Sequence, residues 1–243
     1  MKDIINLKSK YINRYLIPIN NDDYCLIDTG YKGELNKFLA DLKLHGISME
    51  QIKYLIITHM HADHVGFARD LLRLTGAELI YDVNDKLRLE AGKNNMKTYV
   101  PGLFSLISSK ISTMFVERTQ TFPAVFYDNY ADAKTQPLSD YGIEFIFLSG
   151  HTECDLCVKF EDKLFCGDIC MNGILATKHA PLWISNKFNM LDSWRTIRRS
   201  DDIKIIYPSH GKPFVASELD KCIDYWKNKG VLPLFSHSKT RWI

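Results

Sequence analysis

The chain has 243 residues, of which 46% are hydrophobic and 12% aromatic, so it is long enough to bury a sizeable core. Its 31 basic and 29 acidic residues leave a formal charge of +2, which argues against nucleic acid or an anionic membrane as the main partner. No stretch approaches the roughly 20 apolar residues of a membrane span, and the first residues lack a signal peptide's apolar stretch, so we expect a cytoplasmic protein.

The first part of the chain predicts a hairpin, a helix and a buried strand. Two apolar runs, residues 11–19 and 24–27, flank a polar turn and predict the hairpin. Apolar residues then recur at helical spacing from Glu34 up to the stop signal His45-Gly46. The short apolar run 54–57 predicts the next strand.

Further along, helices and strands continue to alternate. A second amphipathic helix follows residue 64 and ends at Gly76. The later elements that the patterns predict are the strands 78–81, 143–148, 156–160, 164–166 and 203–207 and a helix over 191–199. This alternation indicates an α/β architecture, which we expect to form one domain over residues 1–243.

Residues 83–137 interrupt the alternation and contain no convincing metal ligand. Leu103, Ile107, Ile111 and Met114 recur at helical spacing and predict a helical insertion. The insertion either packs on the sheet as an ordinary element or forms a lid whose aromatic side chains line a substrate pocket. Its apolar surface also leaves open a homodimer interface.

Three imidazoles and a carboxylate are concentrated directly after the strand 54–57, in the stretch His59-Met60-His61-Ala62-Asp63-His64. Divalent transition metals take neutral imidazole nitrogens and carboxylate oxygens as ligands. His59 and His61 can point the same way where the chain is extended, whereas the adjacent Asp63 and His64 must diverge. That geometry favours two metals over one. The alternative is a polar loop that is merely rich in histidine.

The same residue types recur at the ends of other predicted strands. His151 follows the strand 143–148, Asp168 follows 164–166, and His210 follows 203–207. Asp28 follows the strand 24–27 and is either a plain turn former or a supporting residue near the site. Four such strand ends suggest one common edge at which the side chains meet.

Together these motifs resemble the metallo-β-lactamase superfamily. In the order typical of that family, the sequence has Ile-Asp-Thr-Gly at 27–30, His-x-His-x-Asp-His at 59–64, Gly-His-Thr at 150–152, Gly-Asp at 167–168 and Ser-His-Gly at 209–211. The resemblance implies an α/β fold, an αββα sandwich of two mixed β-sheets flanked by helices, with a dinuclear metal site at one edge. It implies that His59, His61 and His151 hold one metal and that Asp63, His64 and His210 hold the other. Asp168 would bridge both metals, with Asp28 as a support.

The resemblance also implies a dinuclear-metal-dependent hydrolase in which a metal-bridging hydroxide cleaves a small ester, thioester, lactone or lactam. Asp63 would be the catalytic residue that orients the hydroxide and passes a proton to the leaving group. Zinc is the first expectation for the two divalent ions, with iron or manganese as alternatives. A ligand sensor with slow or incidental hydrolysis and a phosphodiesterase remain alternative functions. The expected partner is a small-molecule substrate.

Two positions depart from the family pattern. Cys154 stands where a glycine often allows close backbone approach, and Met171 stands where members that resemble lactone hydrolases often have a tyrosine. The segment 178–184 either forms a wall of the substrate pocket or is a surface loop. His45, His179 and His237 lie outside the motifs and are expected at the surface or in packing.

Four of the six cysteines lie close to the predicted hairpin 156–166: Cys154, Cys157, Cys166 and Cys170. Thiolates favour zinc, so a structural zinc site is one interpretation. Small buried hydrophobic side chains are the ordinary explanation for cysteines in a chain without a signal peptide, where thiols stay reduced.

Overall fold

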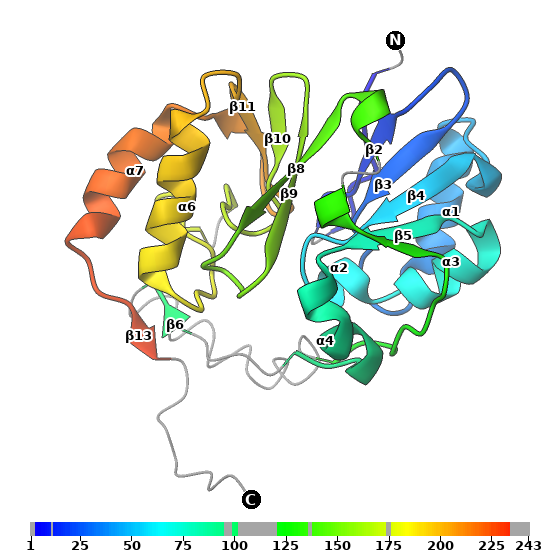
Figure 1. Ribbon diagram of the computed structural model, residues 1–243, viewed down its shortest axis with the longest axis horizontal. Helices are drawn as coiled ribbons and strands as arrows, with labels where there is room; N and C mark the ends of the chain where they lie inside the picture. Colours follow the sequence, from blue (N-terminus) through cyan, green and yellow to red (C-terminus); the bar gives the residue numbers. More distant parts are fainter. Residues whose placement is uncertain are drawn as a thin grey trace, which may run out of the picture.

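The computed structural model describes residues 3–10, 12–94, 99–101, 121–135, 138–173 and 176–233. Within them, two β-sheets lie face to face with helices on both outer faces (Figure 1). This is the αββα sandwich of two mixed sheets that the motifs predicted. No helix among the described residues is both long enough and apolar enough to cross a membrane.

The first sheet has six strands, in the spatial order β1 (Ile5–Asn6), β2 (Tyr15–Pro18), β3 (Tyr24–Ile27), β4 (Ile52–Ile56), β5 (Glu78–Tyr81) and β7 (Tyr130–Asp132). The second sheet has five, in the order β12 (Phe214–Val215), β11 (Ile205–Tyr207), β10 (Lys163–Phe165), β9 (Asp155–Phe160) and β8 (Ile143–Leu148). A separate antiparallel pair joins β6 (Tyr99–Val100) to β13 (Leu232–Pro233).

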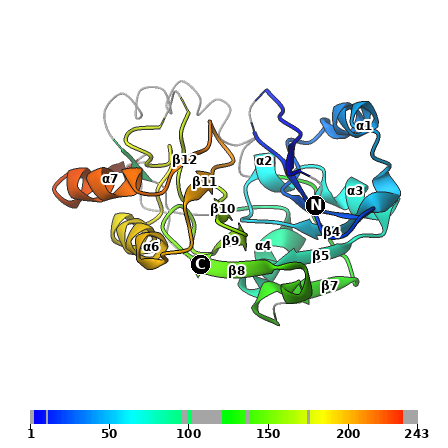
Figure 2. The same cartoon turned by 90° about the horizontal axis from the view of Figure 1, so that it is seen from above.

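Helices α1 (Leu35–Leu44) and α3 (Ala68–Thr75) lie beyond the first sheet, and α6 (Lys187–Arg199) and α7 (Glu218–Lys227) lie beyond the second (Figure 2). Two shorter helices are α2 (Ala62–Val65) and α4 (Lys86–Ala91). Single 3-10 turns cover Met49–Gln51, Val83–Asp85, Ala133–Thr135 and Ser139–Tyr141.

Three apolar cores hold these layers together. The central core lies between the sheets and includes Ile56 from the first sheet and Val158 from the second. Phe38 of α1 belongs to the core on the outer side of the first sheet. Trp194 of α6 and Trp226 of α7, both almost completely buried, belong to the core on the outer side of the second. Burying one large apolar side chain contributes about 1.5–3 kcal/mol, so each helical layer is fastened by its own apolar face.

Most element boundaries follow the signals in the sequence. Helix α1 ends at Leu44 with His45 as its C-cap, and Gly46 beyond it adopts a left-handed conformation with φ of 67°. Helix α3 ends at Gly76, as predicted. Helix α6 begins four residues earlier than its apolar pattern predicted, because the Asn186 side chain accepts hydrogen bonds from the N–H groups of Phe188 and Asn189 and caps the helix.

The prediction of a purely helical insertion over 83–137 was incomplete. Strand β7 pairs in parallel with β5 and extends the first sheet, although its three residues are too few to show a strand periodicity. Phe122 and Val125 are buried in the core on the outer side of the first sheet, which also contains Leu71 and Leu72 of α3. The apolar stripe from Leu103 to Met114 lies outside the described residues.

Candidate metal centre

The strand directions bring the predicted site residues to one edge of the sandwich. In the first sheet β3 and β4 are parallel, so Asp28 and the stretch after β4 leave the sheet at the same end. In the second sheet β8 and β10 both run antiparallel to β9, and β10 is parallel to β11. The three strands that precede His151, Asp168 and His210 therefore point the same way.

The backbone after β4 explains how four neighbouring side chains divide between two positions. His61 is still extended, with φ of −97° and ψ of 152°, and α2 begins at Ala62. Successive residues of a helix point about 100° apart, so Asp63 and His64 turn away from each other. The carbonyl of His64 accepts hydrogen bonds from the N–H and the hydroxyl of Thr29, both at 2.7 Å, which holds α2 against the end of β3.

The first group of converging atoms comes from His59, His61, His151 and Asp168. His59 Nε2 lies 2.9 Å from His61 Nδ1, and His151 Nε2 lies 3.1 Å and 3.0 Å from those two atoms. Ligand nitrogens around a tetrahedral zinc, at 2.0–2.1 Å from the metal, are about 3.3 Å apart. The three nitrogens thus lie slightly closer to one another than they would around a bound zinc ion.

The second group consists of Asp63, His64 and His210, and Asp168 lies between the two groups. Asp168 Oδ2 is 3.5 Å from His64 Nε2, 3.4 Å from His210 Nε2 and 3.7 Å from His151 Nε2. His64 Nε2 and Asp168 Oδ1 are buried without a hydrogen-bond partner. Unsatisfied buried polar atoms are costly, so their presence here fits a site built for cations.

The hydrogen bonds around the cluster set which ring nitrogen faces inward. His151 Nδ1 donates to the carbonyl of Trp183 at 2.8 Å, so its Nε2 carries the lone pair that faces the cluster. His64 Nδ1 likewise donates to Asp28 Oδ2 at 2.7 Å. His59 Nδ1 lies 3.0 Å from the hydroxyl of Thr58, which in turn donates to Asp28 at 2.8 Å.

Burial and charge give the two groups different protonation preferences. Burial lowers the pKa of His59 well below its usual range and that of His61 to about 3, so both rings are neutral, as metal ligands must be. Burial would raise the pKa of Asp63, but His64 and His210 hold that pKa at about 2. Burial would also lower the pKa of His210, yet Asp168 and Asp63 raise it to about 10. In the absence of metal, the proton on His210 thus offsets the negative charge of Asp63 and Asp168. A bound divalent cation would offset that charge instead.

The loop after β8 is closed by a residue that sequence reasoning missed. The carboxylate of Asp155 accepts hydrogen bonds from the N–H of His151 at 3.1 Å, the N–H of Thr152 at 3.0 Å and the Thr152 hydroxyl at 2.7 Å. Cys154 needs no positive φ in this loop and is half-buried. The absent glycine therefore does not disturb the placement of His151. The Thr152-x-x-Asp155 spacing was the signal for this turn.

At Gly167, directly before Asp168, the backbone lies close to the side chain of Thr58. Gly167 has φ of 55°, and a Cβ atom there would lie 2.9 Å from the Thr58 hydroxyl oxygen. Any larger residue would push the end of β10 away from the end of β4. The glycine keeps Asp168 within reach of the histidines from the first sheet.

The structure decides between the two interpretations of the cysteines near the hairpin 156–166. Among the described residues, the sulfurs of Cys154, Cys157, Cys166 and Cys170 do not gather as ligands of one ion, so the proposed structural zinc site was wrong. The last three are buried, as small hydrophobic side chains would be.

The segment 178–184 contributes to the site only at its end. The Trp183 ring stands edge-on to the His61 ring, with 5.9 Å between the ring centres, and its carbonyl holds His151. His179 stacks on Phe214, which confirms its expected packing role. His45 is exposed, as expected, and His237 lies outside the described residues.

Comparison with known proteins shows what the chain is similar to. The sequence model of the metallo-beta-lactamase superfamily matches residues 10–210. A probable metallo-hydrolase of Methanocaldococcus jannaschii is 25% identical over 204 residues, which cover 82% of this chain and 87% of the relative.

Two solved structures have a similar fold. An archaeal metallo-beta-lactamase superfamily protein of Sulfolobus tokodaii has a TM-score of 0.63 at 17% identity, covering 95% of this chain and 86% of that one. A subclass B3 metallo-beta-lactamase of Bradyrhizobium japonicum has a TM-score of 0.57 at 19% identity, covering 85% of this chain and 74% of that one.

Proposed function

Because the chain belongs to the metallo-beta-lactamase superfamily and is a metal-dependent hydrolase, we propose that it uses two divalent ions to cleave a small ester, thioester, lactone or lactam. The observation that carries this proposal is the position of Asp168 Oδ2, which lies within 3.7 Å of imidazole nitrogens from both ligand groups. A carboxylate between two such groups is suited to join two cations.

In this proposal the first ion is held by His59, His61 and His151, the second by Asp63, His64 and His210, and Asp168 contacts both. Zinc suits this set of imidazoles and carboxylates, and iron or manganese would accept the same ligands. When bound, a pair of such ions lowers the pKa of water and polarises the oxygen of the substrate's carbonyl group.

The protein's own side chains would position the reactants and move the proton. The His210 side chain is 23% exposed and that of Asp63 is 9% exposed, whereas the His64 side chain is fully buried. The substrate would therefore approach on the side of Asp63 and His210. Since its pKa is lowered to about 2, the Asp63 carboxylate is ionised and can accept a proton from the attacking water and deliver it to the leaving group.

Metal analysis and a substrate panel would test the proposal. We expect two equivalents of metal per chain and turnover of at least one member of a panel of lactones, thioesters, β-lactams and aryl esters. Asp63→Asn should lower kcat by about 10²–10⁴-fold, the usual contribution of a general acid–base group. His45→Gln, a change at an exposed histidine outside the cluster, should leave kcat and metal content unchanged.

A phosphodiester in the same panel separates the alternatives. Turnover of the phosphodiester alone would favour the phosphodiesterase interpretation. The ligand-sensor interpretation predicts a different outcome. The protein would bind two metals, but Asp63→Asn would not lower the rate for any substrate in the panel. Metal content that is equal in the wild type and in a His59→Ala, His151→Ala double variant would overturn the assignment of the site.

A further inference from the structure

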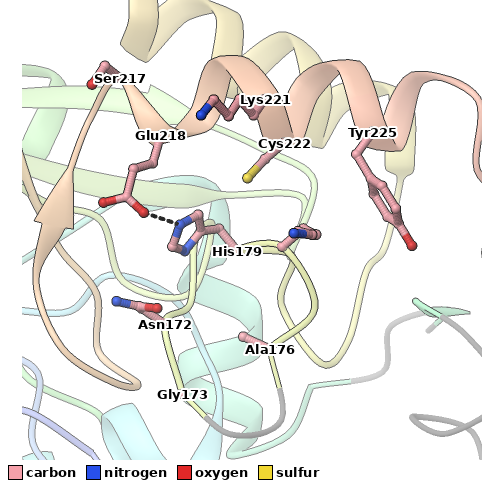
Figure 3. A pocket seen from close by; sticks show the side chains of 10 residues that line it. Asn172, Gly173, Ala176, His179, Ser217, Glu218, Lys221, Cys222 and Tyr225 are labelled. Atoms are coloured by element: carbon pink, nitrogen blue, oxygen red, sulfur yellow. Dashed lines mark hydrogen bonds and ion pairs between the residues drawn. The ribbon is translucent and has the colours of Figure 1, made fainter.

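A cavity of about 610 Å³ lies between the loop that follows Asp168 and helix α7 (Figure 3). Asn172 and Ala176 line it from the loop, and Ser217, Lys221 and Tyr225 line it from α7. None of the lining residues belongs to the metal-ligand groups. The volume falls within the roughly 300–1,000 Å³ of small-molecule pockets.

The backbone beside the cavity is held in an unusual turn. Lys178 and His179 both have left-handed conformations, with φ of 49° and 59°, and the flanking residues Thr177 and Ala180 pair across them. Such two-residue turns favour Asn-Gly, because a side chain there costs roughly 1–2 kcal/mol per residue. Trp226 Nε1 donates to the carbonyls of Thr177 and Lys178, at 3.2 and 3.3 Å, and stabilises the turn. The turn places both side chains at the cavity.

His179 is fully engaged by its neighbours. Its Nδ1 lies 3.1 Å from the carbonyl oxygen of Met171, its Nε2 lies 3.4 Å from Glu218 Oε2, and its ring stacks on Phe214 with 3.8 Å between ring centres. These contacts fix the position of the ring at the cavity, which Cys222 also lines.

The charges around the cavity are not balanced. Glu218 also lines the cavity, with its Oε2 3.4 Å from His179 Nε2, and Asp220 is paired with Arg198 at 2.8 Å. Lys178 and Lys221 line the cavity, and neither forms an ion pair within the part of the chain that the structure describes. Ser217, whose side chain does not cap α7, also lines the cavity. The cavity is therefore lined by two ammonium groups against one carboxylate, that of Glu218.

We propose that this cavity binds a small organic anion, a carboxylate or a phosphate ester, whose acidic group is engaged by Lys178 and Lys221. The apolar body of the anion packs against Tyr225, whose ring lines the same cavity from one turn further along α7. Charged hydrogen bonds from two ammonium groups favour an anionic over a neutral ligand. The size of the cavity leaves room for a body about as large as an aromatic ring.

Calorimetric titration of the metal-loaded, full-length protein with phenylphosphonate, benzoate and neutral benzamide would test this site. We expect both anions to bind and benzamide not to bind, and the tighter anion identifies the acidic group. Lys178→Ala with Lys221→Ala should weaken anion binding at least tenfold. Lys43→Ala with Lys227→Ala removes the same charge from exposed positions outside the cavity and should change Kd less than twofold.

The metal centre offers the anions a second place to bind, so the variants decide where binding occurs. Wild-type affinity in the Lys178→Ala, Lys221→Ala protein would assign the probes to the metals and overturn the proposal. Equal losses in both double variants would show a general charge effect and would also overturn it. Tyr225→Ser should weaken phenylphosphonate several-fold while leaving methylphosphonate unchanged, and no effect on phenylphosphonate would refute the role of Tyr225.

Discussion

Asp28 Oδ2 lies 2.7 Å from His64 Nδ1, and both side chains are completely buried. The same carboxylate accepts hydrogen bonds from the backbone N–H of Thr58 at 2.9 Å and from its hydroxyl at 2.8 Å. Because the Thr58 hydroxyl also contacts His59 Nδ1, one acidic side chain orients a histidine in each ligand group.

Asp28→Asn should therefore impair metal binding without touching a metal ligand. An amide has one acceptor oxygen, so its NH₂ group would face at least one of the donors that Asp28 now accepts. Loss of such supporting contacts typically lowers metal affinity 10–100-fold. Competition with a chromophoric chelator would measure it. Asp220→Asn, in a surface ion pair with Arg198, is the control and should bind metal as the wild type does.

Asp155→Ala should destabilise the loop that carries His151. It removes the acceptor of three hydrogen bonds and leaves their donors buried beside an apolar side chain. We expect the free energy of unfolding to fall by about 3 kcal/mol or more, because hydrogen bonds to charged groups contribute about 1.5–3 kcal/mol each. Urea denaturation measures this loss. A similar loss for Asp140→Ala, at an exposed position, would show that the loop contacts are not responsible.

Chelation should lower the thermal stability of the wild-type protein. An ion present at 100 times its Kd stabilises the folded state by about 2.7 kcal/mol. For a domain of this size that energy corresponds to a decrease in Tm of about 5–10 °C on metal removal. Scanning calorimetry with and without chelator measures the change. The His59→Ala, His151→Ala double variant should show a much smaller change, and an unchanged wild-type Tm would contradict metal binding.

Asp85 should make stability depend on pH between about 4 and 6. Burial raises the pKa of its carboxyl group from 3.8 to about 6, although Arg88 opposes the shift. A folded-state pKa above the unfolded value means that the folded state holds the proton more tightly. Ionisation therefore destabilises the fold as pH rises, with no cost below about 4 and the full cost above about 6.

Asp85→Asn removes this titration. Relative to the wild type, the free energy of unfolding of the variant should increase with pH from about 4 to 6 and then level off. The increase should be on the order of 2–3 kcal/mol, since each pKa unit corresponds to about 1.4 kcal/mol. Denaturant titrations at pH 4, 5, 6 and 7 measure it. Asp140→Asn, at an exposed position, is the control for the loss of an acidic side chain.

The sequence predicted which side chains gather at the candidate site better than it predicted their surroundings. His59, His61, Asp63 and His64 lie within six positions of the chain, and the other candidate ligands each follow a strand whose apolar run is clear. The supporting contacts depend on atoms that no pattern identifies: the backbone carbonyl of Trp183 and the hydroxyl of Thr58. The Trp183 carbonyl contacts a histidine 32 positions away, and the Thr58 hydroxyl is anchored by Asp28, 30 positions away, so both contacts depend on tertiary packing.

The sequence missed strand β7 and the cavity beside α7 because both depend on tertiary contacts. Strand β7 consists of three residues, too few for an alternating pattern, and it is stabilised by pairing with β5 rather than by its own composition. The cavity beside α7 is a product of tertiary packing. Lys178 and Lys221 are 43 positions apart, and nothing in their immediate neighbours marks them as a pair.

The seven side chains of the candidate metal centre come from both halves of the sandwich: four from the loop after β4 in the first sheet, and three from the strand ends of the second. Those four are synthesised early, but His210 is added only when most of the polypeptide has left the ribosome. The complete coordination set cannot exist on a nascent chain that is shorter than this. On the proposed ligand assignment, full loading with metal would therefore be a late event in maturation, and truncation before β11 would remove His210 while keeping His59, His61, Asp63 and His64.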